Sequence, residues 1–187
     1  MTMHEKKSEL VRLPVRIAVF GAESTGKSTL AAALGRRFDA PVAAEYVREF
    51  WDAHGGRIEA EDLTMIARGQ IAGEEAAVAR ATGGLVICDT ELLTNVLWAD
   101  LLFPGRCPAW VRAEAEARSR HYALYLLCDT DIAFAPDPQR CFPDAAGRAM
   151  GRRLWRETLA SRGLPFVEIR GSAEAREAAA VAAITAR

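Results

Sequence analysis

The sequence has no excess of charge of either sign and few histidines. Its 187 residues include 24 lysines and arginines against 25 aspartates and glutamates, a formal net charge of −1 at pH 7. A domain that binds DNA or RNA usually has a basic excess, so the composition gives no support to a nucleic-acid partner. His4, His54 and His121 show no metal-ligand spacing. We therefore expect no metal site beyond Mg²⁺ held by a bound nucleotide.

Long apolar runs and a signal peptide are also missing. A membrane-spanning helix needs about 20 predominantly apolar residues, and the sequence has no such run. Residues 1–14 contain Lys6, Lys7 and Arg12 but no apolar stretch long enough for a signal peptide. We expect residues 1–14 to be a flexible lead-in, and the protein to be cytoplasmic with no membrane partner.

Cysteine is sparse and unpaired in the sequence. Cys88, Cys107, Cys128 and Cys141 are widely spaced and form no C-x-x-C motif. Cys88 and Cys128 end apolar, strand-like runs, where cysteine behaves as a small buried hydrophobic residue. This usage indicates reduced thiols rather than a disulfide framework.

The sequence does contain a phosphate-binding motif. The segment 21–28 fits G-x-x-x-x-G-K-[ST], between a predicted strand, 15–20, and a predicted helix, 27–38. Such a loop directs backbone N–H groups and a helix N-terminus at phosphate oxygens, while its lysine reaches the β- and γ-phosphates and its serine binds Mg²⁺. The predicted ATP contacts are Gly21, Glu23, Ser24, Thr25, Gly26, Lys27, Ser28 and Thr29, with Ser28 also a metal ligand. The alternative is a Gly-Ser turn that only matches the pattern.

Lysine usage supports the functional interpretation of this loop. Lys6, Lys7 and Lys27 are the only lysines among the 24 basic residues. The chain therefore uses arginine almost everywhere, yet has lysine in the loop. A compact ammonium group fits a phosphate cradle better than a broad guanidinium does.

Short apolar runs alternate with longer helical segments along the rest of the chain. This alternation predicts an α/β fold, the three-layer sandwich of P-loop NTPases, with a five-stranded parallel sheet and helices on both faces. We expect one P-loop kinase domain over residues 15–187. The predicted strands are 15–20, 41–44, 85–88, 123–127 and 165–169, and the predicted helices are 27–38, 46–54, 60–81, 92–102, 109–120, 147–161 and 173–186.

Two further details follow from the predicted helices and loops. Glu114 and Arg118 are spaced four apart on a predicted helix, a pattern typical of a solvated helix face. The segment 129–146 contains three prolines and lacks periodicity. A loop of that length inside a compact domain is more often a functional lid than a plain connection.

Asp89 follows the apolar run 85–88, the pattern of the second nucleotide-binding element, Walker B. Ligands gather at the carboxyl ends of strands in such sheets. Asp89 is therefore predicted beside Ser28, as a metal-side and catalytic carboxylate. The alternative is an acid that caps the helix starting near Thr90.

Glu45 stands at the carboxyl end of the predicted strand 41–44 and leads a cluster of aromatic rings and an arginine. The predicted acceptor-binding residues are Glu45, Tyr46, Arg48 and Trp51. The carboxylate could hold or deprotonate a hydroxyl, and a ring could stack on a planar base. The alternative is an amphipathic helix whose Phe50 and Trp51 face the core.

The predicted lid carries Arg140 and is followed by Arg148, Arg152 and Arg153. Arginines brought over the γ-phosphate stabilise the charge of a transferring phosphoryl group. We expect Arg140 to be catalytic and Arg148 to contact the nucleotide, although the pattern does not decide between them.

Taken together, four motifs resemble the ribosylnicotinamide kinase domain of the NadR family. They are the phosphate loop with Thr29 and Leu30, the stretch 44–49, Asp89-Thr90-Glu91, and Asp137 with Arg140. The resemblance implies a compact nucleoside kinase that uses ATP to phosphorylate the 5′-hydroxyl of nicotinamide riboside. It also implies that Glu45, Tyr46 and Arg48 border the riboside.

Two other functions compete with the kinase. A GTPase is excluded because the expected guanine-reading N-K-x-D motif is replaced by 126–131, Leu-Leu-Cys-Asp-Thr-Asp. A regulatory ATPase that controls a partner stays open, since it would keep the phosphate loop and Asp89. The sequence also leaves open the oligomeric state and whether Glu45 or Asp89 is the general base.

Overall fold

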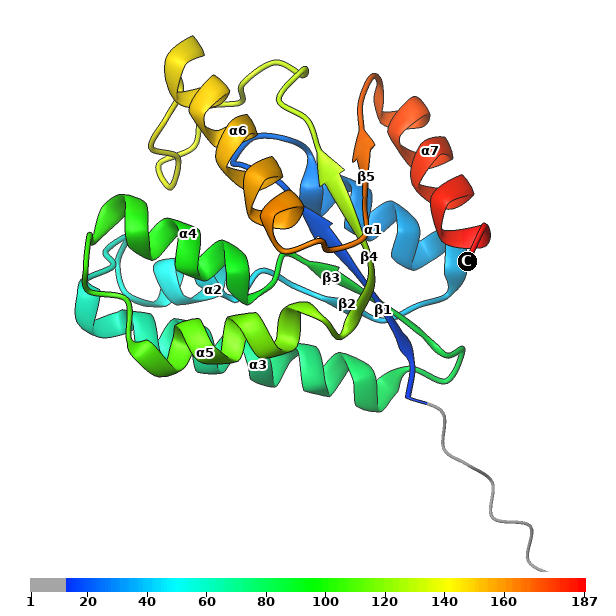
Figure 1. Cartoon of the computed structure of the whole chain (residues 1–187), viewed down its shortest axis with the longest axis horizontal. Coiled ribbons are helices and arrows are strands. Elements are labelled where there is room, and N and C mark those ends of the chain that lie inside the picture. The colour runs from blue at the N-terminus through cyan, green and yellow to red at the C-terminus, as the bar shows by residue number, and fades with distance from the viewer. Residues whose placement is uncertain (1–12) are drawn as a thin grey trace, which may run out of the picture.

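The central strand of the fold is β1 (Val15–Phe20), which leads directly into the phosphate loop. The computed structural model describes residues 13–187, so the predicted lead-in lies almost entirely outside the described residues. β1 belongs to a five-stranded sheet of order β2-β3-β1-β4-β5 in which every pairing is parallel (Figure 1). The other strands are β2 (Val42–Ala43), β3 (Leu85–Asp89), β4 (Tyr122–Cys128) and β5 (Phe166–Ile169).

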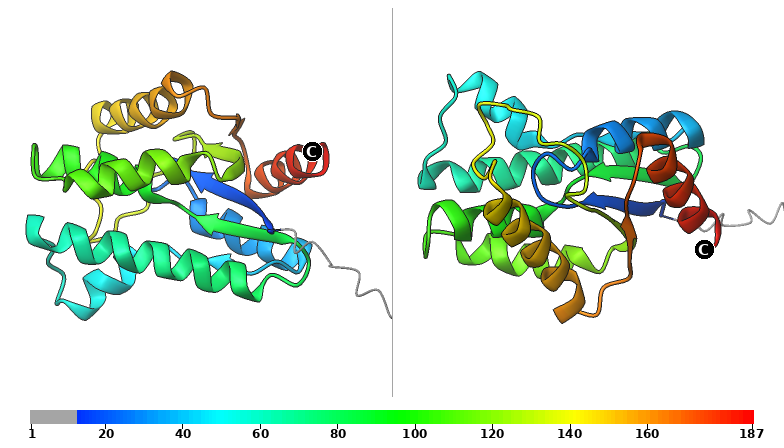
Figure 2. Two further views of the ribbon diagram at one scale, coloured as in Figure 1. Left: turned by 60° about the horizontal axis from the view of Figure 1, so that its bottom comes forward. Right: turned by 90° about the horizontal axis from the view of Figure 1, so that it is seen from above.

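Helices cover both faces of this sheet (Figure 2). Along β1, Ile17 and Val19 pack against α1 and α7, whereas Ala18 and Phe20 belong to the core beneath α3, α4, α5 and α6. The helices are α1 (Lys27–Phe38), α2 (Tyr46–Ala53), α3 (Leu63–Arg80), α4 (Leu92–Leu102), α5 (Ala109–Ser119), α6 (Ala145–Ser161) and α7 (Ala173–Thr185). The predicted three-layer α/β architecture is confirmed.

Several element boundaries differ from the sequence prediction by one residue, and three further differences affect the site or the helix starts. β2 has two residues rather than four. The predicted helix 60–81 is divided into a 3-10 turn, η1 (Ala60–Asp62), and α3. The helix predicted from residue 147 starts two residues earlier, because the Asp144 carboxylate accepts a hydrogen bond from Gly147 N at 2.7 Å and caps α6.

Arg118 corrects the prediction of a solvated helix pair. Its guanidinium does lie 3.8 Å from Glu114, but its side chain is buried and pairs more closely with Glu74 at 3.2 Å and Glu75 at 2.7 Å. The i,i+4 spacing was visible in the sequence, whereas the burial comes from packing α5 against α3.

Parallel pairing brings the carboxyl ends of all five strands to one edge of the sheet. The phosphate loop follows β1, Asp89 ends β3, and the segment 129–144 follows β4. Glu45 comes two residues after β2. The candidate site therefore lies along this edge, as expected for an open parallel sheet. Within the described part of the chain, no helix has both the length and the apolar character needed to cross a bilayer.

Candidate active site

The phosphate loop has the curled backbone that its glycines allow. Gly21 (φ 147°), Ser24 (φ 54°) and Gly26 (φ 75°) have positive φ angles. A Cβ on Gly21 would lie only 2.7 Å from the Cys128 carbonyl oxygen of neighbouring β4, so only glycine fits there. The Lys27 ammonium donates to Ala22 O at 2.8 Å. The lysine thus lies against the loop itself.

Ser28 and Asp89 come together behind the loop. Asp89 pairs with Val19 across the parallel ladder and is 5% exposed. Burial raises the pKa of Asp89, as does the nearby Glu45, while Lys27 and a hydrogen bond from Ser28 lower it. Its Oδ1 atom is buried without a partner in the described residues. A hydroxyl beside an unpaired carboxylate oxygen is a donor set that suits a hard cation such as Mg²⁺.

No ready-made metal cage accompanies this pair. Among residues 13–187, no three histidine, cysteine or acidic side chains gather closely enough to hold a metal ion by themselves. Any Mg²⁺ here would take most of its ligands from nucleotide and water, which is its usual mode of binding.

Two acids lie at the end of β3 and just after it, Asp89 and Glu91, and they have different surroundings. Glu91, not Asp89, caps α4, because its carboxylate accepts from Leu93 N at 2.9 Å. The alternative role considered for Asp89 thus belongs to Glu91. Thr90 between them has φ 73°, a strained conformation for a β-branched residue. Such strain is concentrated at functional sites, where the surrounding structure holds it.

The predicted lid segment lies directly on the phosphate loop. The Glu23 carboxylate accepts from the backbone N–H groups of Cys141 (2.9 Å) and Phe142 (2.6 Å). The Ser24 hydroxyl accepts from Ala135 N at 2.9 Å. Two adjacent loop residues therefore hold both arms of the lid, so the position of the lid depends on the conformation of the phosphate loop.

The two lid arginines have different surroundings. Arg140 reaches Ser24 Oγ at 3.4 Å, and its Nε is buried without a partner among the described atoms. Arg148 instead donates to the carbonyls of Thr130 (2.6 Å) and Ile132 (2.7 Å). Each arginine therefore has a buried nitrogen without a partner among the described atoms, Nε in Arg140 and Nη1 in Arg148, but Arg140 reaches the phosphate loop and Arg148 holds the lid backbone.

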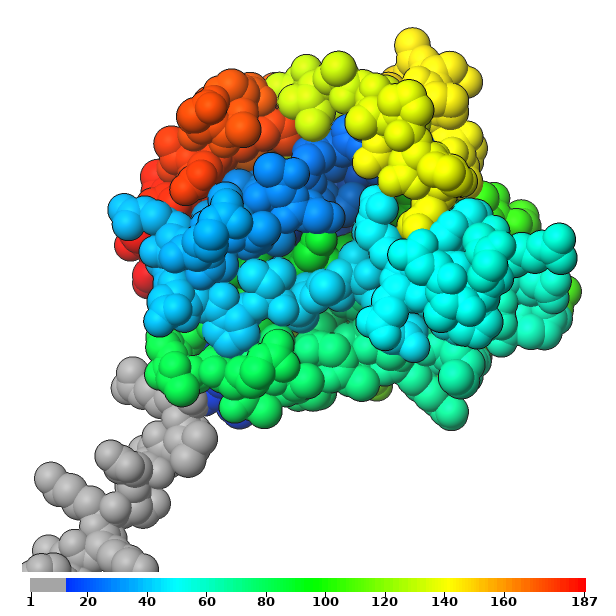
Figure 3. All heavy atoms as spheres, turned by 180° about the vertical axis from the view of Figure 1, so that it is seen from behind, coloured from blue at the N-terminus to red at the C-terminus, as the bar shows by residue number. Residues whose placement is uncertain are grey.

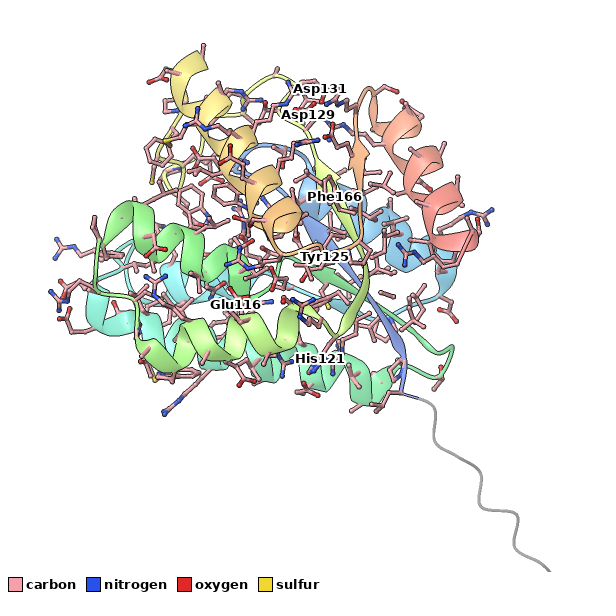
Figure 4. All side chains as sticks on the ribbon, in the orientation of Figure 1. Glu116, His121, Tyr125, Asp129, Asp131 and Phe166 are labelled. Atoms are coloured by element: carbon pink, nitrogen blue, oxygen red, sulfur yellow. The ribbon has the colours of Figure 1, made fainter. Side chains whose placement is uncertain are left out.

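A buried arginine of α7, which the sequence analysis did not identify, supports the phosphate loop. Arg176 of α7 is 4% exposed and donates to the carbonyls of Thr25 (2.9 Å), Gly171 (2.8 Å) and Asp129 (3.1 Å). It also pairs with Asp131. Figure 4 shows Asp129 and Asp131 together just beyond β4, close to the end of β5. This arginine connects the loops after β1, β4 and β5.

The acceptor side is centred on Glu45. Its carboxylate accepts from Arg48 Nε at 3.2 Å, and Arg48 also reaches Asp137 of the lid at 3.3 Å. Burial lowers the pKa of Arg48, but Glu45 and Asp137 outweigh it and the net pKa is raised. Figure 3 shows the same junction at the surface, where the yellow lid meets the cyan α2 region. Arg48 therefore links Glu45 to the lid.

A cavity of about 200 Å³ joins these two sides. The charged residues that line it from the phosphate side and the lid are Glu23, Lys27 and Arg140. Those that line it from α2 and its start include Glu45, Arg48 and Trp51. Its inner wall comes from α3, α4 and α5 and is mostly apolar. One space thus has the lysine of the phosphate loop at one end and an apolar, aromatic chamber at the other, which is the arrangement expected of a small-molecule site.

The aromatic residues of α2 divide between core and cavity. Phe50 is 3% exposed and stacks on His54, with ring centroids 3.8 Å apart, so it belongs to the core. Trp51 lines the cavity. Tyr46 is not among the lining residues; its ring lies against α3, where a Cβ on Gly69 would be 2.1 Å from the ring. Of the predicted acceptor residues, Glu45, Arg48 and Trp51 line the cavity and Tyr46 positions the helix.

A buried polar network fixes the start of α2. Gln70 accepts from Tyr46 N at 3.0 Å and donates to Glu74 at 3.3 Å. Glu74 is fully buried, and it also accepts from Tyr122 OH at 2.7 Å and pairs with Arg118. Each member of this network thus has at least one partner, although Arg118 Nε is buried without one among the described atoms. The network anchors the backbone directly after Glu45 to the core.

The structure brings most of the predicted site residues together. Lys27, Ser28 and Asp89 lie on the phosphate side, and Glu45 with Arg48 lies across the cavity from them. Sequence reasoning missed the supporting groups, which are Gln70, Glu74, Glu91, Arg118 and Arg176. The stretch Asp89-Thr90-Glu91 was noted in the sequence, and its second acid was the signal that could have identified Glu91. Nothing in the local pattern marked Gln70, Glu74 or Arg176, and the pattern at Arg118 indicated a solvated helix pair instead.

The fold and the loop after β1 define a P-loop protein with a parallel α/β sheet. A family model described as "AAA domain" matches residues 16–176. The chain belongs to this family.

Two curated relatives are NadR proteins. It is 26% identical over 158 residues to the trifunctional NAD biosynthesis/regulator protein NadR of Salmonella typhimurium and 26% identical over 157 residues to that of Escherichia coli. These matches cover 82% of this chain but only 38% and 37% of the two relatives, so the chain spans well under half of their length. The predicted resemblance to the NadR family is confirmed.

Solved structures share the fold. A NadR protein in complex with NR has a TM-score of 0.73 at 23% identity, over 93% of this chain and 51% of that chain. A NadR protein in complex with NAD and AMP-PNP has a TM-score of 0.70 at 24% identity, over 93% and 49%. Deoxyadenosine kinase from M. mycoides with bound dATP has a TM-score of 0.58 at 11% identity, over 91% and 99%.

Proposed function

We propose that the chain is an ATP-dependent kinase that phosphorylates the 5′-hydroxyl of a small nucleoside, with nicotinamide riboside as the favoured acceptor. The observation that carries this proposal is the single cavity lined by both Lys27 and Glu45. A regulatory ATPase needs the first residue but has no use for an acceptor chamber facing it. The relatives named NadR and the NadR structure in complex with NR support the choice of acceptor.

In the reaction, the 5′-oxygen of the riboside forms a bond to the γ-phosphorus of ATP. The bond from that phosphorus to the β,γ-bridging oxygen breaks, and ADP leaves. We assign the phosphate charge to the loop N–H groups, Lys27 and Arg140, all of which serve the phosphate side. Electrostatic stabilisation of this kind is usually the largest contribution to phosphoryl transfer.

We assign the acceptor hydroxyl to Glu45. Its carboxylate lines the cavity and is held by Arg48 at 3.2 Å, so it can orient the hydroxyl and take its proton as the new bond forms. Asp89 is not among the cavity-lining residues and lies with Ser28 instead. These two would hold Mg²⁺, which supplies charge neutralisation on the phosphates when bound. The geometry thus supports an acceptor role for Glu45 and a metal role for Asp89.

The aromatic walls suit the proposed acceptor. Trp51 and Trp98 both line the cavity. The nicotinamide ring of the riboside is planar and cationic, and tryptophan is the side chain whose face best attracts such a ring. ATP itself is supported as the phosphate donor by the phosphate loop and by the fold shared with a protein solved with AMP-PNP.

The test is ADP formation by the purified protein with Mg²⁺, with and without a panel of ribosides. We expect ADP formation to require a riboside, with nicotinamide riboside the best acceptor. The product should carry phosphate at the 5′ position, and the 5′-deoxy analogue should be inert. ADP formation at the same rate without any riboside would instead support the regulatory ATPase.

A further inference from the structure

The helix that begins beside Glu45, α2, is not capped by Glu45 itself. Glu45 is the N-cap residue of α2, but its side chain makes no cap hydrogen bond within the described structure. Its carboxylate instead accepts from Arg48 Nε at 3.2 Å and lines the cavity. The N–H groups at a helix start need acceptors and attract negative charge, and the N-cap side chain is their usual partner. An unpartnered start of α2 would therefore draw the Glu45 carboxylate toward the helix and away from the cavity.

Gln70 of α3 supplies an acceptor from outside the helix. Its Oε1 accepts from Tyr46 N, the first N–H of α2, at 3.0 Å. Gln70 is 2% exposed, and its Nε2 donates to Glu74 at 3.3 Å. Because a backbone N–H donates and a carboxylate accepts, these two neighbours fix which end of the carboxamide faces each of them. The oxygen of Gln70 is thus held at the start of α2.

The same turn of α3 also holds Tyr46 by its ring. A Cβ on Gly69 would lie 2.1 Å from the Tyr46 ring, so the ring lies directly on the α3 backbone. Glu74 in turn pairs with Arg118 at 3.2 Å, which anchors the carboxamide's partner in the core. The residue after Glu45 is therefore held at both its ring and its N–H. A functional side chain is placed accurately when the groups behind it are locked in this way.

We propose that Gln70 is a positioning residue for Glu45. By accepting the N–H of Tyr46, Gln70 partners the start of α2, so that the Glu45 carboxylate faces the acceptor hydroxyl rather than its own helix. This inference rests on the proposed function. Gln70 is not among the described residues that line the cavity, so it acts on the reaction through Glu45 and not by touching the substrate.

The experiment is a double-mutant cycle of Gln70→Met and Glu45→Gln, assayed for phosphorylation of nicotinamide riboside. Methionine resembles glutamine in length but cannot accept from the Tyr46 N–H. We expect Gln70→Met to lower kcat about tenfold or more and to leave the KM for ATP within about twofold, because displacing a reacting group slows the chemical step. In the Glu45→Gln background the same change should cost less than about twofold, because the carboxylate that Gln70 positions is then absent.

Tyr125→Phe is the matched control, because it also removes one buried hydrogen bond between a side chain and the backbone, that from Tyr125 OH to Ser119 O at 2.9 Å. It should lose stability but keep kcat within about twofold. Circular dichroism shows that each variant is folded. If Gln70→Met does not fold, Gln70→Asn takes its place in the cycle. This change withdraws the carboxamide from Tyr46 N and should lower kcat about threefold or more in the same pattern.

The outcomes separate the inference from the kinase proposal. Equal factors of loss from the Gln70 change with and without Glu45→Gln would show a purely structural role and overturn the inference, as would an unchanged kcat. In both cases wild type still phosphorylates the riboside, so the kinase proposal stands. A wild type that phosphorylates no riboside would overturn the kinase proposal and the inference with it.

Discussion

The phosphate side and the acceptor side of the site are built in different ways. The phosphate side is a continuous segment, 21–28, whose backbone N–H groups and Lys27 are the groups we propose to bind the phosphates. The acceptor side is assembled from α2, α3, α4 and the lid, and depends on side chains that lie far apart in the sequence. The first side is therefore a property of local sequence, and the second a property of tertiary packing.

Each side also rests on its own buried arginine. Arg176 donates to the carbonyl of Thr25 in the phosphate loop. Arg118 pairs with Glu74, which connects through Gln70 to the backbone beside Glu45. The lid touches both sides, through Glu23 on one and Arg48 on the other. The lid is thus hydrogen-bonded to both sides of the site.

The largest expected effect is on the phosphate side. Lys27→Ala should lower kcat more than a hundredfold, about 3 kcal/mol of lost transition-state stabilisation, because the phosphates lose a direct counter-charge. The fold should survive, since Lys27 contacts the loop rather than the core. Steady-state kinetics with circular dichroism as a control tests this. A near-normal kcat in the folded variant would refute the assignment of the loop.

Replacing Arg140 of the lid should affect phosphoryl transfer, which is the function we propose for the phosphate side. Arg140→Ala should lower kcat by about tenfold or more and raise the KM for ATP much less, because its charge matters most while the phosphoryl group is transferred. Arg148→Ala is the comparison variant, since that arginine holds lid carbonyls. If Arg140→Ala changes only the KM for ATP, the catalytic role passes to another lid residue.

A smaller effect is expected on the pH dependence of stability, and it concerns Glu91 in the turn between β3 and α4. Burial raises the pKa of Glu91 from its usual 4.5 to about 8. Between these values the folded protein keeps a proton that the unfolded chain releases. The free energy of unfolding should therefore fall as pH rises through this window, by up to about 1.4 kcal/mol per pH unit. Above it the contribution should stay constant.

Glu91→Gln cannot ionise and keeps an oxygen for the N–H of Leu93, so its stability should depend less on pH over the same window. Urea midpoints of both proteins at several pH values between about 5 and 8 give the comparison. Parallel curves for the two proteins would mean that Glu91 is already ionised in the folded state.

The same contrast explains what the sequence could predict. Hydrophobic periodicity located the strands and helices within a few residues, and the phosphate loop could be identified because its chemistry lies in consecutive residues. Asp89 and Glu45 were predicted correctly at the carboxyl edge of the sheet, because parallel strands share that edge. The roles proposed for these residues remain predictions.

The remaining features depend on contacts that no local pattern encodes. The sequence pattern around Arg118 matches a solvated helix pair. In the structure, α5 packs against α3 and Arg118 is buried beside Glu74. Tyr46 was expected at the acceptor, but the absence of a side chain at Gly69 lets its ring lie against α3 instead. Arg176 gave no signal, because its partners are backbone carbonyls of three separate loops.

The most direct test of the two-sided site is calorimetric titration of ATP and nicotinamide riboside into matched variants, with turnover measured on the same samples. Lys27→Ala should weaken ATP binding and leave riboside binding within about twofold. Glu45→Gln should leave ATP binding within about twofold but lower riboside phosphorylation at least about tenfold, while Asp89→Asn should weaken the response to Mg²⁺. If Glu45→Gln and Asp89→Asn alter Mg²⁺ dependence equally and neither affects the acceptor, the division into two sides is contradicted.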